Sequence, residues 1–317
     1  MITLLRSAPL RLALLGHGFI GKMHHQAALA CGLEVTHICR SGDNWRNVVA
    51  SSDVDAVVIG TPNALHHPQA LAAFAAGKHV LVDKPMALTV VEADDMIDAA
   101  SEAQRTLLVG HMWRYRDEVI ATRNRIAAGS VGRPVRTRGY GIHAGWGPSG
   151  WFTDPALAGG GALIDMGIHA IDTARFLLGD PVPVRVVASV GTAHGEYSVE
   201  DDAVVLIEWL MADGTIVRSV VECGWWQPRL DGVEADTEVY GTAGYERIWP
   251  QFTPATLAAE DYVHCAPPMY AAQMADFARC CVTGGRPVAD AGVGRTALQV
   301  TELAYRSAGR DWLSPKV

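Results

Sequence analysis

The sequence LALLGHGFIG, residues 12–21, joins a short apolar run to a glycine-rich turn and the start of a helical pattern. A buried strand that leads through Gly-x-Gly-x-x-Gly into a helix is the context that turns this weak pattern into a dinucleotide-binding fingerprint. In this interpretation Gly16 allows the tight turn, Gly18 lets a pyrophosphate approach the backbone, and Gly21 lets helix and strand pack closely. A chance glycine turn is the alternative.

The residues after this turn indicate which dinucleotide to expect. Phe19 and Ile20 lie at the helix start, where free backbone amides face the phosphates. About 20 residues further on, an NAD enzyme usually offers Asp or Glu to the ribose hydroxyls. Here Arg40 and Ser41 stand instead, and a guanidinium with a hydroxyl suits a 2′-phosphate. The sequence therefore favours NADP over NAD, with the nearby Asp43 as the competing signal and a solvated Arg40 as the alternative.

Up to about residue 118, short apolar runs alternate with segments of helical spacing. Such alternation is typical of a parallel, doubly wound sheet with helices on both faces. We therefore predict an α/β Rossmann domain over residues 1–118. Its expected strands are 12–15, 35–39, 56–59, 80–82 and 107–109, and its clearest expected helices are 69–76 and 91–103.

After about residue 130 the pattern changes to strands that follow one another with few helices between them. This order predicts an α+β domain over residues 119–317 with a mostly antiparallel, open sheet. The expected strands are 135–140, 184–190, 204–210, 215–221 and 237–240, and the expected late helices are 271–281 and 295–307. The last helix has two interpretations, within its own domain or packed back on the first.

The composition is that of an ordinary globular protein. Its 317 residues are 49% hydrophobic and 19% charged, enough for two packed cores. A net charge of −8 and a pI near 5.8 argue against a nucleic-acid partner. The apolar run 12–15 is too short for a signal peptide or a membrane span. The six cysteines show no Cys-x-x-Cys pair, so we expect reduced thiols and a cytoplasmic protein without a membrane partner.

A second informative stretch, GGGALIDMGIHAID, covers residues 159–172. It places Asp165 and His169 four residues apart, so on a helix they share one face. A histidine beside a carboxylate can shuttle a proton near neutral pH. The same stripe, with Asp172, also fits the wet face of an amphipathic helix. A dinucleotide site upstream needs a proton-handling partner, which favours catalysis for Asp165 and His169 and leaves Asp172 to the scaffold.

The fingerprint and three further segments resemble the Gfo/Idh/MocA family of oxidoreductases, named for glucose-fructose oxidoreductase and inositol dehydrogenase. The segments are GTPNALH at 60–66, GKHVLVDKP at 77–85 and the glycine-rich stretch at 159–172. Their order and spacing match across nearly the whole chain, including the tail 273–307. The loop at 60–66 resembles the family's strand-four loop under the nicotinamide half of the cofactor, which assigns to the cofactor site Thr61, Pro62, Asn63 and His66.

The segment 77–85 resembles the family's Glu-Lys-Pro strand end, with one departure. Asp83 replaces the usual Glu; it keeps the charge but is one methylene shorter, which leaves its contacts open. Lys84 is present at the carboxyl end of a buried strand, where ligands bind in parallel sheets. The resemblance assigns both residues to the cofactor site and Lys84 also to catalysis. A structural ion pair between the two is the alternative.

The resemblance implies hydride transfer between C4 of a nicotinamide and a carbon that bears a hydroxyl or a carbonyl. His169 is then the expected general base, Lys84 hydrogen-bonds the reacting oxygen, and Asp165 binds a neighbouring hydroxyl. The expected enzyme is an NAD(P)-dependent dehydrogenase of a sugar, a sugar derivative or a cyclitol. Two alternatives stay open: an NAD-dependent glycosidase, and a regulator that binds NADP and a sugar without turnover.

Aromatic and polar residues near these segments are substrate candidates. Trp146 and Trp151 precede the catalytic stretch, and indole faces commonly pack against the C–H face of sugars, although core packing is the more frequent fate of a tryptophan. His143 could add a hydrogen bond. Arg114 and Tyr115 are similar candidates at the end of the first domain.

The sequence predicts no metal site. Four histidines resemble a metal cluster by count, but a nicotinamide site needs no metal, and their segments face the cofactor; they are His24, His25, His66 and His67. The resemblance also implies a homodimer or homotetramer formed through the open face of the second domain's sheet.

Overall fold

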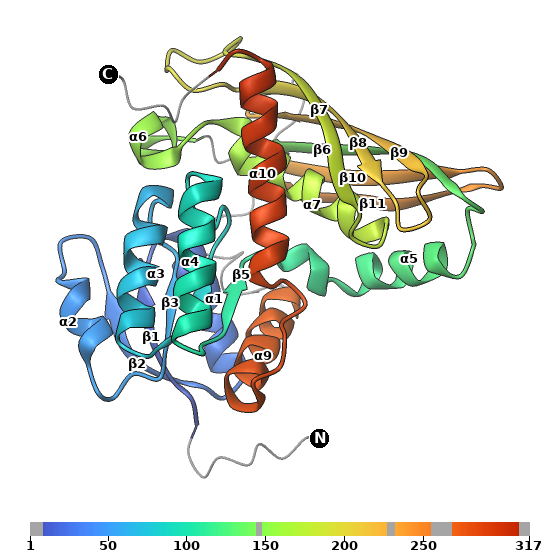
Figure 1. The fold of residues 1–317 in the computed structure, drawn as a ribbon. Helices are drawn as coiled ribbons and strands as arrows, with labels where there is room; N and C mark the ends of the chain where they lie inside the picture. The colour runs from blue at the N-terminus through green and yellow to red at the C-terminus, as the bar shows by residue number, and fades with distance from the viewer. Residues whose placement is uncertain (1–8, 144–147, 227–231, 255–267, 311–317) are drawn as a thin grey trace. The chain divides into compact units, whose positions relative to one another are not determined.

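The computed structural model describes residues 9–143, 148–226, 232–254 and 268–310, which form two compact units (Figure 1). Unit 1 contains the described residues of Met1–Tyr115 and Ala259–Arg295, and unit 2 those of Arg116–Ala258 and Thr296–Val317. Unit 1 therefore takes in a segment from late in the chain, which the expected boundary at residue 118 had left in the second domain.

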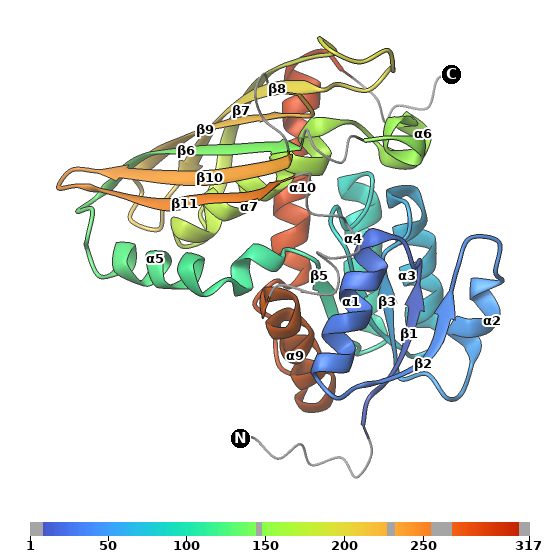
Figure 2. The same cartoon turned by 180° about the vertical axis from the view of Figure 1, so that it is seen from behind.

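Unit 1 is built on a five-stranded parallel sheet in the order β2-β1-β3-β4-β5. Helices α3 and α4 lie on one face of this sheet and α1 and α9 on the other (Figures 1 and 2). This arrangement confirms the predicted doubly wound sheet. The strands are β1 (Arg11–Leu15), β2 (Glu34–Cys39), β3 (Ala56–Ile59), β4 (His79–Val82) and β5 (Leu107–Val109). The helices are α1 (Phe19–Ala30), α2 (Trp45–Ala50), η1 (Asn63–Leu65), α3 (His66–Ala75), α4 (Val90–Glu102), η2 (Met112–Tyr115) and α9 (Pro268–Thr283).

The strands of unit 1 are covered on both faces, which explains their continuous apolar runs. Every residue of β3 and β5 is buried, as expected for parallel strands between two helical layers. Phe277 of α9 packs in the same apolar cluster as Leu14 and Leu81 of the sheet. The late segment is thus part of this core.

Unit 2 is built on a six-stranded sheet in the order β11-β10-β6-β9-β8-β7. Only the β6–β9 pair is parallel among these neighbours, which confirms the predicted mostly antiparallel sheet. Its strands are β6 (Pro134–His143), β7 (Val182–Gly191), β8 (Asp202–Leu210), β9 (Ile216–Gly224), β10 (Gly232–Gly241) and β11 (Tyr245–Pro254). Its helical segments are α5 (Asp117–Ala127), η3 (Gly150–Thr153), α6 (Pro155–Ala158), η4 (Leu163–Gly167) and α7 (Ile168–Leu177).

One face of this sheet is covered and the other is open. Helix α7 packs on β6, β9 and β10, and α5 packs on β11. Along β8, buried residues such as Val205 and Ile207 alternate with exposed Val204 and Leu206. The last helix, α10 (Ala291–Ser307), is divided between the units at Arg295. Among the described residues, no helix is both long and apolar enough to cross a membrane.

Candidate functional site

The turn after β1 depends on contacts that only glycine permits. Gly16 has a φ of +88°, and a Cβ there would lie 2.4 Å from the carbonyl oxygen of Gly60. A Cβ on Gly21 would lie 2.2 Å from the carbonyl oxygen of Gly16, so α1 packs directly on the turn. By contrast, a Cβ on Gly18 would meet nothing within 4 Å. The space beside Gly18 is therefore open where α1 begins.

The start of α1 is suited to an anion. Gly18 caps the helix without a side-chain hydrogen bond, and its carbonyl accepts from the amide of Lys22 at 3.0 Å. The amides of Ile20 and Gly21 in the first turn have no acceptor one turn back within the helix. A diphosphate supplies such acceptors, and the helix dipole favours its charge. Together with the open space, these amides fit the diphosphate of a dinucleotide; Phe19, at the same turn, is 39% exposed.

The loop after β2 lies next to this turn, because the amide of Gly16 donates to the carbonyl of Cys39 at 2.9 Å. Arg40 and Ser41 are exposed. The amide of Arg40 donates to Oδ2 of Asp43 at 2.7 Å. Asp43 therefore accepts from its own loop, and the exposed guanidinium and hydroxyl remain at the surface.

The loop after β3 is fixed by its own side chains. Thr61 Oγ1 donates to Oε1 of Gln69 at 2.8 Å, Pro62 precedes the short helix η1, and Asn63 is buried. His66 is also buried, and its two ring nitrogens lie 2.9 Å from the Thr61 carbonyl oxygen and 2.8 Å from that of Pro85. The ring of His66 thus joins the loop after β3 to the loop after β4.

The loop after β4 carries Asp83 and Lys84. The amide of Asp83 donates to the carbonyl of Ile59 at 2.9 Å, and its carboxylate lies 3.4 Å from Nε2 of His24. The same carboxylate lies so close to Gly110 that a Cβ there would approach it to 2.6 Å. The shorter side chain that replaces the family's Glu is therefore enclosed between His24 and Gly110. Lys84 follows, half-buried.

Arg114 and Tyr115 lie on η2 and are both buried within unit 1. The hydroxyl of Tyr115 donates to Oδ2 of Asp276 at 2.8 Å and accepts from the amide of Ala289 at 3.2 Å. Burial, together with the Asp276 charge, raises the pKa of Tyr115. The hydroxyl expected to meet substrate is thus occupied in joining η2 to α9.

In unit 2, side chains and backbone of the protein pack closely against the triple-glycine turn that precedes Asp165 and His169. A Cβ on Gly160 would lie 2.2 Å from the hydroxyl of Tyr305, and one on Gly161 would lie 1.9 Å from the carbonyl oxygen of Glu200. The buried carboxylate of Glu200 accepts from the amides of Gly161 and Leu163, each at 2.9 Å, and from the Tyr305 hydroxyl at 2.7 Å. Burial nevertheless raises the pKa of Glu200. The glycines thus leave room for Glu200 and Tyr305 to contact the turn directly.

Asp165, His169 and Asp172 are all buried, with 8%, 5% and 2% of their surfaces exposed. The wet-face interpretation of this stripe is therefore wrong. Asp165 lies in a π-helical turn, η4, which continues into α7 with His169 and Asp172. Such turns occur frequently at functional sites.

The carboxylate of Asp165 is held by two donors. Trp225 Nε1 donates to Oδ2 at 3.0 Å, and Nδ1 of His143 lies 3.4 Å from the same oxygen. Trp225, one residue after the end of β9, carries no signal of this role in the sequence. Trp151 stacks on Phe152 with ring centroids 4.1 Å apart and is partly exposed. Trp146, the other predicted sugar-packing residue, lies outside the described residues.

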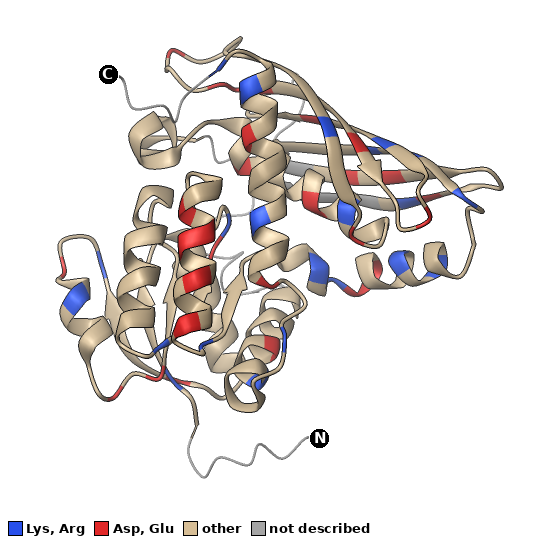
Figure 3. Cartoon of the chain, viewed as in Figure 1, with Lys and Arg blue, Asp and Glu red and all other residues tan. Residues whose placement is uncertain are grey.

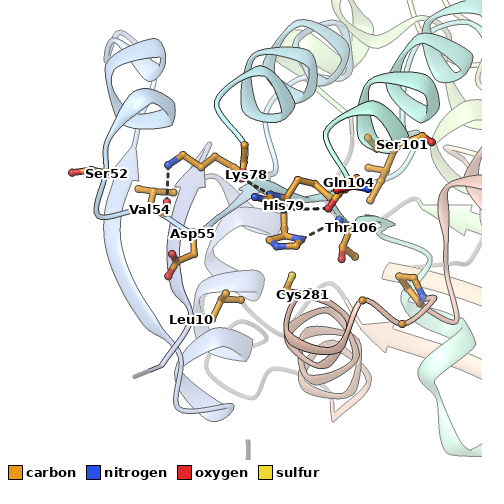
Figure 4. A pocket seen from close by; sticks show the side chains of 17 residues that line it. Leu10, Ser52, Val54, Asp55, Lys78, His79, Ser101, Gln104, Thr106 and Cys281 are labelled. Atoms are coloured by element: carbon orange, nitrogen blue, oxygen red, sulfur yellow. Dashed lines mark hydrogen bonds between the residues drawn. The ribbon is translucent and has the colours of Figure 1, made fainter. Parts of the chain in front are cut away.

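A cavity of about 750 Å³ in unit 1 lies at the opposite edge of the sheet from the loops after β1, β3 and β4 (Figure 4). Its lining includes Leu10, Asp55 and His79, which precede or begin β1, β3 and β4. Lys78 Nζ donates to the carbonyls of Ser51 and Val54, each at 2.8 Å. The cavity is therefore at the amino ends of the parallel strands, whereas a dinucleotide binds at their carboxyl ends in such folds. The ammonium of Lys78 is already hydrogen-bonded to carbonyl oxygens of the protein.

Charged residues are distributed unevenly in unit 1. Acidic residues follow one another along α4, as Figure 3 shows. Two of them are paired, Asp94 with Arg295 and Asp95 with His67 at 3.3 Å. Within the described ranges, no three His, Cys, Asp or Glu side chains are grouped as a metal ion requires.

Both units match known families. Residues 39–111 match the family described as "Oxidoreductase family, NAD-binding Rossmann fold", and residues 119–246 match the "GFO/IDH/MocA C-terminal domain". Among solved structures, GenD2 from gentamicin A biosynthesis, in complex with NAD, has a TM-score of 0.79 and 26% identity, covering 95% of this chain and 94% of that one.

Curated relatives of the chain are also oxidoreductases of sugars or their derivatives. The chain is 40% identical over 167 residues to 1,5-anhydro-D-fructose reductase of Ensifer adhaerens, a match that covers 52% of this chain and only 50% of that protein. It is 30% identical over 245 residues to D-glucoside 3-dehydrogenase of Escherichia coli strain K12, covering 66% of this chain and 69% of that protein. With both units matched in order along the chain, the protein belongs to the Gfo/Idh/MocA family of oxidoreductases.

Proposed function

We propose that this protein is an NAD(P)-dependent dehydrogenase that transfers a hydride between the nicotinamide and a hydroxyl or carbonyl carbon of a sugar, a sugar derivative or a cyclitol. One observation carries the proposal: the buried carboxylate of Asp165 is held on one oxygen by Trp225 and His143, four residues before a buried histidine. The names of the relatives, a reductase of an anhydro sugar and a glucoside dehydrogenase, support the substrate class.

The chemistry divides between cofactor and protein. The bound nicotinamide supplies or accepts the hydride. In the oxidation direction, His169 takes the hydroxyl proton as general base, an effect typically worth about 10²- to 10⁴-fold in rate. Lys84 hydrogen-bonds the reacting oxygen and stabilises its developing negative charge. Asp165 binds a neighbouring hydroxyl and orients the sugar, since its own position is fixed by Trp225.

We further propose NADP as the preferred cofactor. The exposed Arg40 and Ser41 offer a guanidinium and a hydroxyl to a 2′-phosphate, while Asp43 accepts from the Arg40 amide. The NAD in GenD2 is the opposing observation. Steady-state kinetics with both cofactors tests the choice: Arg40→Ala should lower kcat/KM for NADP by about tenfold or more and leave that for NAD nearly unchanged. A wild-type preference for NAD would overturn the assignment.

A substrate panel tests the function as a whole. Aldoses, anhydro sugars, glucosides, sugar acids and inositols are incubated with NADP or NAD, and formation of the reduced nicotinamide is followed by its absorbance. We expect turnover of at least one polyol, abolished in Lys84→Met. Release of an aglycone without accumulation of reduced cofactor would instead identify an NAD-dependent glycosidase. Sugar binding without turnover would identify the regulator.

A further inference from the structure

The chain neighbours of Lys84 are each contacted by a buried histidine. On one side, His24 Nε2 lies 3.4 Å from Oδ1 of Asp83. On the other, His66 Nδ1 lies 2.8 Å from the carbonyl oxygen of Pro85. His24 is 0% exposed and His66 1% exposed. They come from different elements, α1 and the start of α3. Two rings that are far apart in sequence thus converge on one three-residue segment.

The ring of His24 has a defined donor. Its partner is a carboxylate, which accepts, so Nε2 carries the proton. Nδ1 is buried and has no hydrogen-bond partner among the described residues. An edge-on contact with Tyr270, centroids 5.9 Å apart, fixes the ring plane. The polar contact of His24 is therefore directed at Asp83.

The ring of His66 faces two acceptors, the carbonyls of Pro85 and Thr61. Burial has the largest influence and lowers the pKa of His66, although the Pro85 carbonyl and the Asp83 charge act in the opposite direction. A neutral ring has one N–H and donates to one carbonyl at a time. The contact to Pro85 acts on the Lys84 segment, and the contact to Thr61 acts on the loop after β3.

We propose that His24 and His66 are positioning residues that hold the Lys84 ammonium in place for the reacting oxygen, by fixing Asp83 and Pro85 on either side of it. The inference rests on the role of Lys84 in the proposed function. It also gives Asp83 a role that its departure from the family's Glu had left open: its carboxylate is the acceptor for His24. Displacement of a catalytic group by about 1 Å can cost 10²-fold in rate, so both contacts act mainly on kcat.

Paired substitutions separate positioning from mere stability. His24→Gln keeps a donor toward Asp83, whereas His24→Leu removes it. His66→Asn keeps a donor at the place of Nδ1, toward Pro85, whereas His66→Gln moves the donor to the place of Nε2, toward Thr61. We expect His24→Leu and His66→Gln to lower kcat roughly 10- to 100-fold with little change in KM for the cofactor, and His24→Gln and His66→Asn to recover most of it. His67→Gln, on the neighbouring residue of α3, is the matched control and should leave kcat unchanged.

A second measurement does not depend on turnover. The lysines of the chain are Lys22, Lys78, Lys84 and Lys316, so reductive ¹³C-methylation gives a simple NMR spectrum. The signal of Lys84, assigned with Lys84→Arg, should shift or broaden in His24→Leu and His66→Gln and stay in place in His24→Gln, His66→Asn and His67→Gln.

Together, kcat and the Lys84 NMR signal show whether the positioning role or the proposed function has failed. A Lys84 signal that is identical in all variants would overturn the positioning role, as would equal losses of kcat in the conservative and the disruptive variants. Absence of turnover with every sugar would reject the proposed function, while the NMR comparison would still show whether the two histidines hold Lys84.

Discussion

At the scale of single residues, the polar groups proposed for the chemistry of unit 2 are buried and held by protein donors. Asp165 and His169 are enclosed, and Trp225 and His143 fix the carboxylate through a single oxygen. A carboxylate held in this way loses little further freedom when it binds a hydroxyl, which is how preorganised sites lower the cost of orienting a substrate. Asp172 is deeper still, in line with a scaffold role.

The general base is tested by substitution of His169. His169→Ala should lower kcat by at least about 100-fold with the fold intact, because the hydroxyl proton then has no acceptor. Steady-state kinetics and circular dichroism measure the two properties. Asp172→Asn is the comparison, and it should change the free energy of unfolding more than it changes kcat. Near-normal turnover in His169→Ala would remove this residue from the mechanism.

At the scale of elements, the turn that leads into η4 depends on close packing around its glycines. Gly160 has a φ of +159°, and its missing Cβ leaves room for the Tyr305 hydroxyl, which in turn donates to Glu200. These contacts reach Gly161 and Leu163 at the start of the π-helical turn. The backbone that carries Asp165 is therefore anchored by the carboxylate of Glu200. The glycine pattern in the sequence does not predict this contact.

Gly160→Ala tests this anchoring. The added Cβ would displace Tyr305, so we expect the free energy of unfolding in urea to fall by about 3 kcal/mol or more. Gly150→Ala is the matched control, because Gly150 has a positive φ of +61° but a Cβ there meets nothing within 4 Å. Its cost should be the backbone strain alone, about 1–2 kcal/mol. Equal losses in the two variants would show that strain and not the contact with Tyr305 is responsible.

The loop between β7 and β8 is tied to the buried Asp201. Its carboxylate accepts from the amides of Ala193, His194 and Gly195 at 2.7 Å, 3.0 Å and 2.7 Å and from the hydroxyl of Tyr197 at 3.1 Å. Burial by itself would raise the pKa of Asp201, but these donors outweigh it and the pKa is lowered from 3.8.

This lowered pKa predicts acid sensitivity. A carboxyl group with a lower pKa in the folded state stabilises the fold fully above its unfolded pKa, and the contribution is lost as the pH falls through the folded value. Asp201→Asn should therefore lower the free energy of unfolding by about 1–3 kcal/mol at about pH 7 and by less at about pH 3. Urea unfolding at both pH values measures the difference, and a pH-independent loss would contradict the charged interaction.

At the scale of the whole molecule, the β7 and β8 end of the second sheet exposes several aliphatic side chains, whereas exposed arginines and carboxylates follow on the neighbouring strands. The exposed large hydrophobic side chains on β7 and β8 are Val182, Val184, Val187, Val204, Leu206 and Leu210. Arg185, Ser189 and Asp202 are exposed on the same two strands. Adjacent exposed aliphatic side chains on a sheet face are typical of an interface between copies. We propose that a second copy of the chain covers this face, as the family resemblance leads us to expect.

Leu206→Glu tests this assembly. A carboxylate among these aliphatic side chains cannot be buried between two copies without a large desolvation cost, so the variant should be monomeric in analytical ultracentrifugation while the wild type is a dimer or tetramer. Val91→Glu, on the surface of unit 1 with 71% of the residue exposed, is the control and should leave the oligomer intact. An unchanged oligomer in Leu206→Glu would place the interface elsewhere.

The sequence predicted the strands of unit 1 to within one residue, because continuous apolar runs between glycine turns are a strong local signal. It missed β11, which contains Pro250 and polar residues at the edge of the sheet, where the alternation is weak and proline is tolerated. It also gave α9 to the second domain, since no local signal tells which core an amphipathic helix joins.

The sequence by itself determined the two sheet types, the glycine turn at 16–21 and the segments that carry Lys84, Asp165 and His169, because periodicity and turn chemistry act over a few neighbouring residues. Only the tertiary structure decided what holds these groups in place. Trp225 meets Asp165 from 60 positions away, and His24 meets Asp83 from 59 positions away. Contacts of this kind form when whole elements pack against one another, and this packing leaves no pattern in the stretch of sequence around either partner.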